Sequence, residues 1–319
     1  MRSLLTTCVI VLAIQTGRLF VHAQDLSDEN DSSKAQTPQE QLEAARRLLI
    51  AANDPAERDL RDGRLQECRQ LISAARQVLS ESVAQDELSL REYPAFIPFE
   101  EVDMRVARQR VETQLMSNQL AHAQCHLLEA ELPGEKDVRK RLFDAAFVEY
   151  EQLHRRYRSQ VAGLYARLMQ GKCSQETGDL RIALGIYEEL LGHEGISPSL
   201  VGLKDRALQF RLECLNSDER KDFKLVEQEG ATWLAENFGR AGSSSGLAIR
   251  WELCRALAAL GRDPKCTDEE RDGYLKRALE MSEELNHATD DYKSGTRQLI
   301  DQIQQELNGE AVPSDPTTT

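Results

Sequence analysis

The fold is decided by residues 163–191, which read GLYARLMQGKCSQETGDLRIALGIYEELL. Apolar and small residues recur at helical spacing on both sides of Gly178. Gly178 suits the tight end of a helix, because glycine readily accepts the positive φ found there. The stretch therefore predicts two helices that are separated by a short turn and pack as an antiparallel pair.

The second helix of this pair has counterparts elsewhere in the chain. Residues 146–153 (AFVEYEQL) match residues 183–190 (ALGIYEEL) at an offset of 37 residues, and a weaker echo at 222–234 follows at an offset of 43. A fourth unit holds Leu275, Ala278, Ser282 and Leu285. Self-similarity at this period is typical of a helical solenoid.

This pattern resembles the tetratricopeptide repeat (TPR) family. Gly171 stands where that family has the small residue that lets its two helices approach, and Ala183 and Tyr187 stand at contact positions of its second helix. Arg167 and Ser174 depart from the family, which has bulky residues there, and both offsets exceed the family period of about 34 residues. The resemblance implies an all-α fold, a TPR-like α-solenoid of antiparallel helix pairs.

The N-terminus has the pattern of a cleavable export signal. Arg2 precedes an apolar run, Leu4–Ile14, that is shorter than the roughly 20 residues needed to span a bilayer, and small residues at Val21 and Ala23 suit a signal peptidase. An uncleaved anchor is the alternative. The predicted segments are a signal peptide at 1–23, a disordered leader at 24–36, an N-terminal helical region at 37–131, TPR-like helical repeats with a capping helix at 137–308, and a disordered tail at 309–319.

Local signals place helices in the N-terminal region. Residues 37–40 (TPQE) form a capping box with a proline in the first turn, which predicts a helix start. Residues 93–99 (YPAFIPF) hold two prolines that favour extended backbone. We expect the apolar residues between the two prolines to pack across the helices as a strap. A long helix from about Glu101 to Glu131 is expected to follow.

Composition excludes several classes of partner. The chain has a formal net charge of −14, and removing residues 1–23, which hold Arg2 and Arg18 and no acidic residue, leaves −16. Such an acidic chain is unsuited to nucleic acid or to anionic lipid. No later segment is apolar enough to be transmembrane. Together with the export signal at residues 1–23, this predicts a location outside the cytosol, in a periplasm or cell envelope, or secretion.

Six cysteines remain after Cys8 leaves with the signal, and most fall on apolar helical stripes. They are Cys68, Cys125, Cys173, Cys214, Cys254 and Cys266. This placement favours buried free thiols, which behave as small hydrophobic residues. A disulfide between Cys254 and Cys266 stays open as an alternative, because an exported protein can oxidise its thiols.

One cluster has the spacing of metal ligands. His122, Cys125 and His126 lie three and four residues apart, so one helix face could direct them to a zinc ion, with Glu129 one turn further on. The alternative is that Cys125 packs in the core with Leu128 while the histidines flank it. No second ligand cluster and no catalytic motif accompany it, so we predict neither a bound metal, nor a cofactor, nor enzymatic activity.

Basic residues form the most distinctive surface signal in this acidic chain. Residues 139–141 (RKR) and 154–158 (HRRYR, with Arg155, Arg156 and Arg158) lie on one predicted helix. Together with Arg167, Gln170 and Ser174 of the next helix, the arginines of the second cluster are candidates to line a groove for an acidic segment or a C-terminal carboxylate. The alternative is that the arginines neutralise neighbouring acids.

The function expected from these features is that of an exported, non-catalytic protein-interaction scaffold, whose partner the sequence does not name. One rival is a metal-binding protein or enzyme that uses His122, Cys125 and His126. Another is a structural subunit of a cell-envelope complex.

Overall fold

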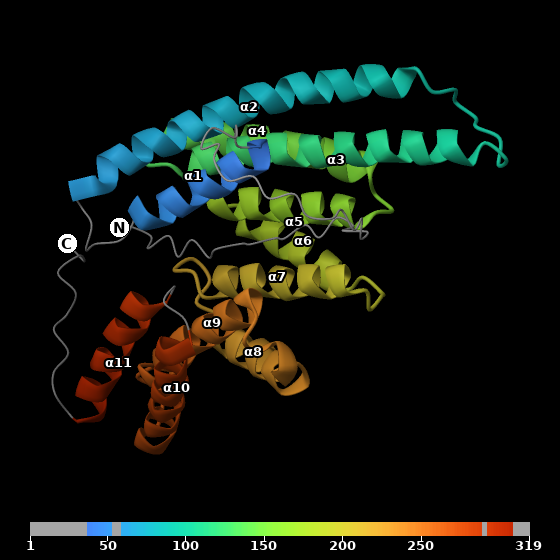
Figure 1. Ribbon diagram of the computed structural model, residues 1–319. Helices are drawn as coiled ribbons and strands as arrows, with labels where there is room; N and C mark the ends of the chain where they lie inside the picture. The colour runs from blue at the N-terminus through green and yellow to red at the C-terminus, as the bar shows by residue number, and fades with distance from the viewer. Residues whose placement is uncertain (1–36, 53–58, 289–291, 309–319) are drawn as a thin grey trace, which may run out of the picture. The chain divides into compact units, whose positions relative to one another are not determined.

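The computed structural model describes residues 37–52, 59–288 and 292–308, and these are all-α with no strand. The predicted signal peptide, leader and tail, and Cys8, lie outside the described residues. None of the helices is long and apolar enough to cross a bilayer. The helices are α1 Pro38–Ala52, α2 Arg61–Arg91, α3 Val102–Glu131, α4 Lys136–Arg156, α5 Val161–Glu176, α6 Leu180–Leu191, α7 Pro198–Leu215, α8 Phe223–Glu236, α9 Ser244–Gly261, α10 Asp268–Ala288 and α11 Lys293–Leu307, with a 3-10 turn η2 at Phe238–Arg240 (Figure 1).

The helices belong to two compact units. The N-terminal unit ends at Leu153 and the C-terminal unit begins at His154, so the division falls near the end of α4. This division differs from the boundary expected from the sequence, which separates the N-terminal helical region from the repeats between residues 131 and 137.

In the N-terminal unit, α1 packs against α2, and α2 packs against α3. The core comes from apolar stripes at helical spacing on all three helices, as the spacing predicts. It includes Leu42, Ala45, Leu49, Leu65, Cys68, Ile72, Ala75, Leu79, Ala121, Cys125 and Leu128. The predicted capping box also forms, because the Glu40 carboxylate accepts a hydrogen bond from the Thr37 N–H at 2.7 Å and Thr37 Oγ1 accepts one from the Glu40 N–H at 3.3 Å.

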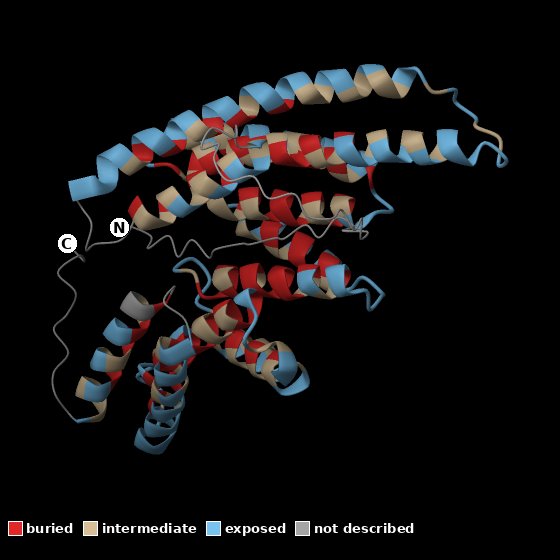
Figure 2. Ribbon diagram, viewed as in Figure 1, coloured by how far each residue is buried: buried red, intermediate tan, exposed pale blue. Residues whose placement is uncertain are grey.

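The helices α2 and α3 form a long hairpin whose buried residues are confined to one end (Figure 2). At the other end, the expected strap at 93–99 does not bury its aromatic rings, because Phe96 is 79% exposed and Phe99 is 77% exposed. The Arg108 side chain of α3 donates to the carbonyls of Pro94 and Ala95, and Ile97 is half-buried while Phe96 stays exposed. That part of the prediction was wrong.

In the C-terminal unit, consecutive helices pack in adjacent pairs. Contacts join α5 to α6, α6 to α7, α8 to α9, α9 to α10 and α10 to α11, and further contacts join α5 to α7 and α7 to α9. The pair predicted at 163–191 is confirmed as α5 and α6. Gly178 between them has φ +87°, and the side chain of Asp179 caps α6 by accepting from the Ile182 N–H at 3.2 Å.

The apolar positions of the repeated pattern are buried in α4, α6, α8 and α10. They are Ala146, Tyr150 and Leu153, then Ala183, Tyr187 and Leu190, then Val226 and Trp233, and finally Leu275, Ala278, Ser282 and Leu285. Gly171 of α5 allows the close approach expected of it, because a Cβ atom there would lie 2.6 Å from Cε1 of Tyr187.

The cysteines of the described residues are all free thiols, and every one except the half-buried Cys266 is buried. Cys254 and Cys266 are therefore not joined, and Cys266 donates instead to the carbonyl of Leu260. Burial raises the pKa of Cys68 to about 11 and that of Cys125, Cys214 and Cys254 to about 12.

A buried carboxyl group makes the stability of the C-terminal unit depend on pH. Glu252 of α9 is buried, and its carboxylate accepts from Asn216 Nδ2 at 2.7 Å and from Arg255 Nη1 at 2.9 Å. Burial raises the pKa of Glu252 above its ordinary 4.5, and the nearby positive charge of Arg255 lowers it by less. The folded state therefore holds this proton more tightly than the unfolded state.

We expect the free energy of unfolding to fall as pH rises from 4.5 through the raised pKa of Glu252, because there the folded chain binds more protons than the unfolded chain. Glu252→Gln should remove this decline, whereas Glu219→Gln, at an exposed position, should keep it. Urea titrations at several pH values can follow it by tryptophan fluorescence, since both tryptophans, Trp233 and Trp251, lie in the C-terminal unit. An unchanged decline in Glu252→Gln would assign it to another group.

Candidate functional site

Three ionisable side chains meet between α3 and α4 of the N-terminal unit. His122 and His126 lie one turn apart on α3 and share a face. Across from them on α4, one Glu149 carboxylate oxygen lies 3.1 Å from Nδ1 of His122, and the other lies 3.2 Å from Nε2 of His126. All three side chains are partly exposed, so solutes can reach them.

Local sequence explains why these side chains are held at an edge. On α3, the histidines flank Cys125, which is buried in the core. On α4, Glu149 immediately precedes Tyr150, which is fully buried together with Ala146. Each histidine and Glu149 is therefore next to a buried residue in the sequence. Packing of that buried neighbour places the polar side chain at the edge of the helix layer.

Ser80 of α2 completes the surroundings of His122. Its hydroxyl donates to the carbonyl of Arg76 at 2.8 Å and lies 3.2 Å from Nε2 of His122. The Ser80 hydroxyl therefore contacts the ring nitrogen of His122 that does not face Glu149.

The Glu149 carboxyl group is ionised at neutral pH. Burial raises the pKa of Glu149, but hydrogen bonds from His122 and His126 lower it by more, to about 2. The carboxylate is ionised and faces two imidazole nitrogens, an arrangement that suits a bound proton or a metal cation.

Two of the residues predicted as ligands, Cys125 and Glu129, do not belong to this cluster. Cys125 points into the core and donates to the carbonyl of Ala121 at 3.4 Å, so it does not join His122 and His126. Glu129 forms an ion pair with Arg76 instead. Cys125 packs beside Leu128, as the alternative interpretation expected. Glu149 is 27 residues away from His122 and belongs to no motif, so only the side-chain contacts between α3 and α4 reveal it.

The first basic cluster binds its own neighbours. Arg139 donates to the carbonyl of Ala130 at 2.8 Å, Lys140 pairs with Asp144, and Arg141 donates to the carbonyl of Asp137. In the second cluster, Arg155, Arg156 and Arg158 are exposed, and Arg156 stacks over the ring of Tyr157. The two clusters were expected on one helix, but α4 ends at Arg156, so Arg158 lies beyond it.

The remaining groove candidates lie on α5. Arg167 forms an ion pair with Glu189 of α6 at 2.6 Å and donates to Gln170 at 2.8 Å. Gln170 and Ser174 are buried, and Ser174 donates to the carbonyl of Gln170. Their side chains therefore pack inside the helical layer, and they offer no exposed surface to a partner.

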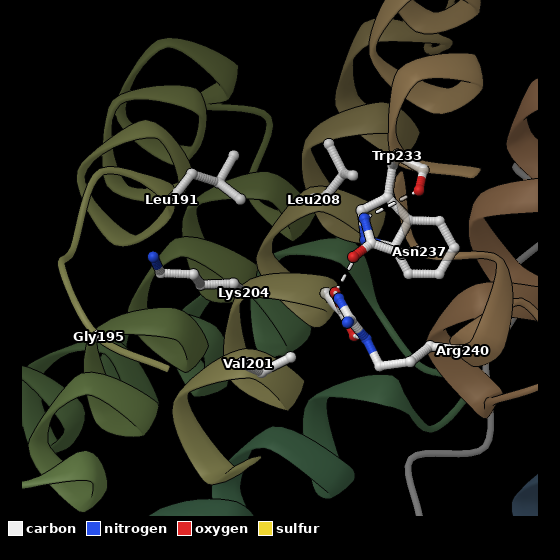
Figure 3. A pocket seen from close by; sticks show the side chains of 9 residues that line it. Leu191, Gly195, Val201, Lys204, Leu208, Trp233, Asn237 and Arg240 are labelled. Atoms are coloured by element: carbon white, nitrogen blue, oxygen red, sulfur yellow. Dashed lines mark hydrogen bonds and ion pairs between the residues drawn. The ribbon is translucent and has the colours of Figure 1, made fainter. Parts of the chain in front are cut away.

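A pocket of about 310 Å³ opens in the C-terminal unit between α7 and α8 (Figure 3). Its apolar walls are Leu191, Val201, Leu208 and Trp233. Asp205 in its wall is fixed by Trp233 and Arg240, while Lys204 enters from α7 on the side opposite Trp233. Of its lining residues, Trp233 belongs to the repeated pattern, and the sequence does not predict the pocket.

Comparisons of the chain with protein-family models, with curated proteins and with solved structures found no match.

Proposed function

We propose that this protein is an exported, non-catalytic protein-interaction scaffold built from TPR-like helical repeats. The ladder of contacts from α5 to α7 to α9, with each intervening helix packed beside it, supports a short solenoid. Burial of the repeated apolar positions supports the same arrangement. The proposal of export rests on the pattern of residues 1–23.

One observation carries the interaction role: the open end of the α2–α3 hairpin exposes large apolar side chains. This aromatic tip consists of Leu88, Phe96, Phe99, Val102 and Val106. Arg105 stacks over the ring of Phe99 at 4.4 Å and leaves the ring exposed. Large exposed apolar groups near one another in the fold are typical of interaction sites, and aromatic residues supply much of the binding energy there.

The occupant that fits the aromatic tip is a protein with an apolar groove. A membrane surface fits less well, because the formal charge of the chain is −14 and anionic lipid would repel it. The structural-subunit alternative uses the same tip but predicts a permanent, stoichiometric complex. Co-purification from native membranes separates a permanent complex from transient partners.

Replacing both tip phenylalanines, as Phe96→Ser with Phe99→Ser, should reduce partner recovery by at least about 10-fold, because removing interface anchors typically costs more than that factor. Proximity labelling in the native envelope, with the label fused to the full chain, measures the loss. The fold should survive, since both rings are solvent-exposed.

Phe238→Ser provides a matched control, because Phe238 of η2 is an 85% exposed phenylalanine in the C-terminal unit. It should leave the labelled neighbours unchanged. Equal labelling by wild type and by the double variant would rule out the aromatic tip as the interaction site. Recovery outside the cytosol of a chain that begins at Gln24 would support export, and an intact leader in the cytosol would contradict it.

A further inference from the structure

The two histidines and the carboxylate between α3 and α4 have the spacing of metal ligands. Two ligand atoms that each lie about 2.0–2.1 Å from a tetrahedral zinc ion are separated by roughly 3.3 Å. The carboxylate oxygens of Glu149 lie 3.1 Å from Nδ1 of His122 and 3.2 Å from Nε2 of His126. One ligand atom from each residue lies within 4.8 Å of both others, so a single ion can contact all three.

His122 is held between two oxygen groups. Its Nδ1 lies 3.1 Å from a carboxylate oxygen of Glu149, and its Nε2 lies 3.2 Å from the Ser80 hydroxyl. A cation in the gap between Nδ1 and the carboxylate would therefore contact both ligands. Ser80 would keep its contact with the far nitrogen and orient the ring, as the partner of a metal-bound histidine does.

We propose that His122, His126 and Glu149 form a binding site for one divalent transition-metal ion, with Zn²⁺ as the natural probe. Imidazole nitrogens with one carboxylate suit zinc and its neighbours in the first transition row, whereas Mg²⁺ and Ca²⁺ require mainly oxygen ligands. The site goes beyond the scaffold role and does not depend on it. Three protein ligands leave a further coordination position for water or for a partner's side chain.

The buried Nδ1 of His126 limits the affinity that we expect for a metal ion. A metal on Nε2 leaves the ring hydrogen on Nδ1, which is buried and has no partner among the described residues. An unpaired buried donor costs free energy, and this site has one ligand fewer than a closed structural zinc site. We therefore expect a Kd on the order of 1 μM rather than in the nanomolar range.

Isothermal titration of the metal-stripped, purified full chain with ZnCl₂ tests the proposal. The expected result is one Zn²⁺ per chain and no heat with MgCl₂. His122→Gln, His126→Gln and Glu149→Gln should each weaken binding by at least about 10-fold, because even outer-shell substitutions have effects of that size. His193→Gln, at an exposed histidine outside the cluster, and Cys125→Ala should keep wild-type binding.

A measurement on the wild-type chain makes the test independent of how the variants fold. Co²⁺ substituted at the site should give visible absorption without the intense sulfur-to-metal band that a Cys125 ligand would produce. Circular dichroism of each variant without metal verifies its helices. Absence of one-to-one zinc binding, or equal binding by Glu149→Gln and both histidine variants, would overturn the proposal and leave a proton as the occupant of the gap.

Discussion

Gly171→Ala is expected to lower the free energy of unfolding of the C-terminal unit by about 2–3 kcal/mol, the upper part of the range for overpacked cores. The added Cβ would lie 2.6 Å from Cε1 of Tyr187 and 3.1 Å from Cγ2 of Ile186. The Tyr187 ring cannot retreat freely, because it is fully buried and its hydroxyl donates to Gln175 at 2.9 Å. Urea unfolding followed by tryptophan fluorescence measures the loss.

Gly185→Ala provides the matched control. Gly185 lies inside α6, and a Cβ there would meet no atom within 4 Å. Alanine should stabilise the unit by about 0.5–1 kcal/mol, because glycine inside a helix costs that much backbone entropy. If both substitutions destabilised the chain equally, the close approach of α5 to α6 would not be the reason for glycine at position 171.

Asp205→Ala should destabilise the C-terminal unit by about 3 kcal/mol. The buried carboxylate of Asp205 on α7 accepts from Trp233 Nε1 at 2.8 Å and from Arg240 Nε and Nη2 at 2.8 and 2.9 Å. Its removal leaves the indole N–H buried without an acceptor. The Arg240 side chain is 42% exposed and can be rehydrated, which keeps the loss below that of a fully buried pair.

The emission of Trp233 should change together with the loss of stability, because its indole loses its hydrogen-bond partner. Asp218→Ala tests whether the effect is specific, since Asp218 is exposed and pairs only at the surface with Lys221. Its stability should stay within about 0.5 kcal/mol of wild type. A small loss in Asp205→Ala would mean that the contacts of α7 with α8 and η2 depend on apolar packing alone.

Features that depend on one or two helical turns could be predicted from the sequence. The capping box at Thr37 and Glu40, the positive φ of Gly178 and the small residue at Gly171 each follow from neighbours a few positions away. The buried repeat positions follow from spacing alone, because helical periodicity fixes which side chains share a face. These signals were sufficient to predict the pair of helices α5 and α6.

Features that depend on which helix covers which face could not be predicted in this way. The spacing suggested that Cys125 lies with His122 and His126. In the structure Cys125 is buried in the core, and Glu149 of another helix, α4, lies beside the histidines. The two prolines lie in a non-helical segment between α2 and α3, yet no signal within 93–99 shows whether another helix covers Phe96. Such outcomes are decided by tertiary contacts between residues far apart in the sequence.

The buried cysteines give the chain built-in probes of its own opening. Only the thiolate reacts with alkylating reagents, and burial raises the pKa of Cys68 to about 11 and that of Cys214 to about 12. Modification therefore requires the helices to separate first. Because Cys68 and Cys125 belong to the N-terminal unit and Cys214 and Cys254 to the C-terminal unit, mass spectrometry after a timed alkylation pulse can follow each unit separately, without any introduced label.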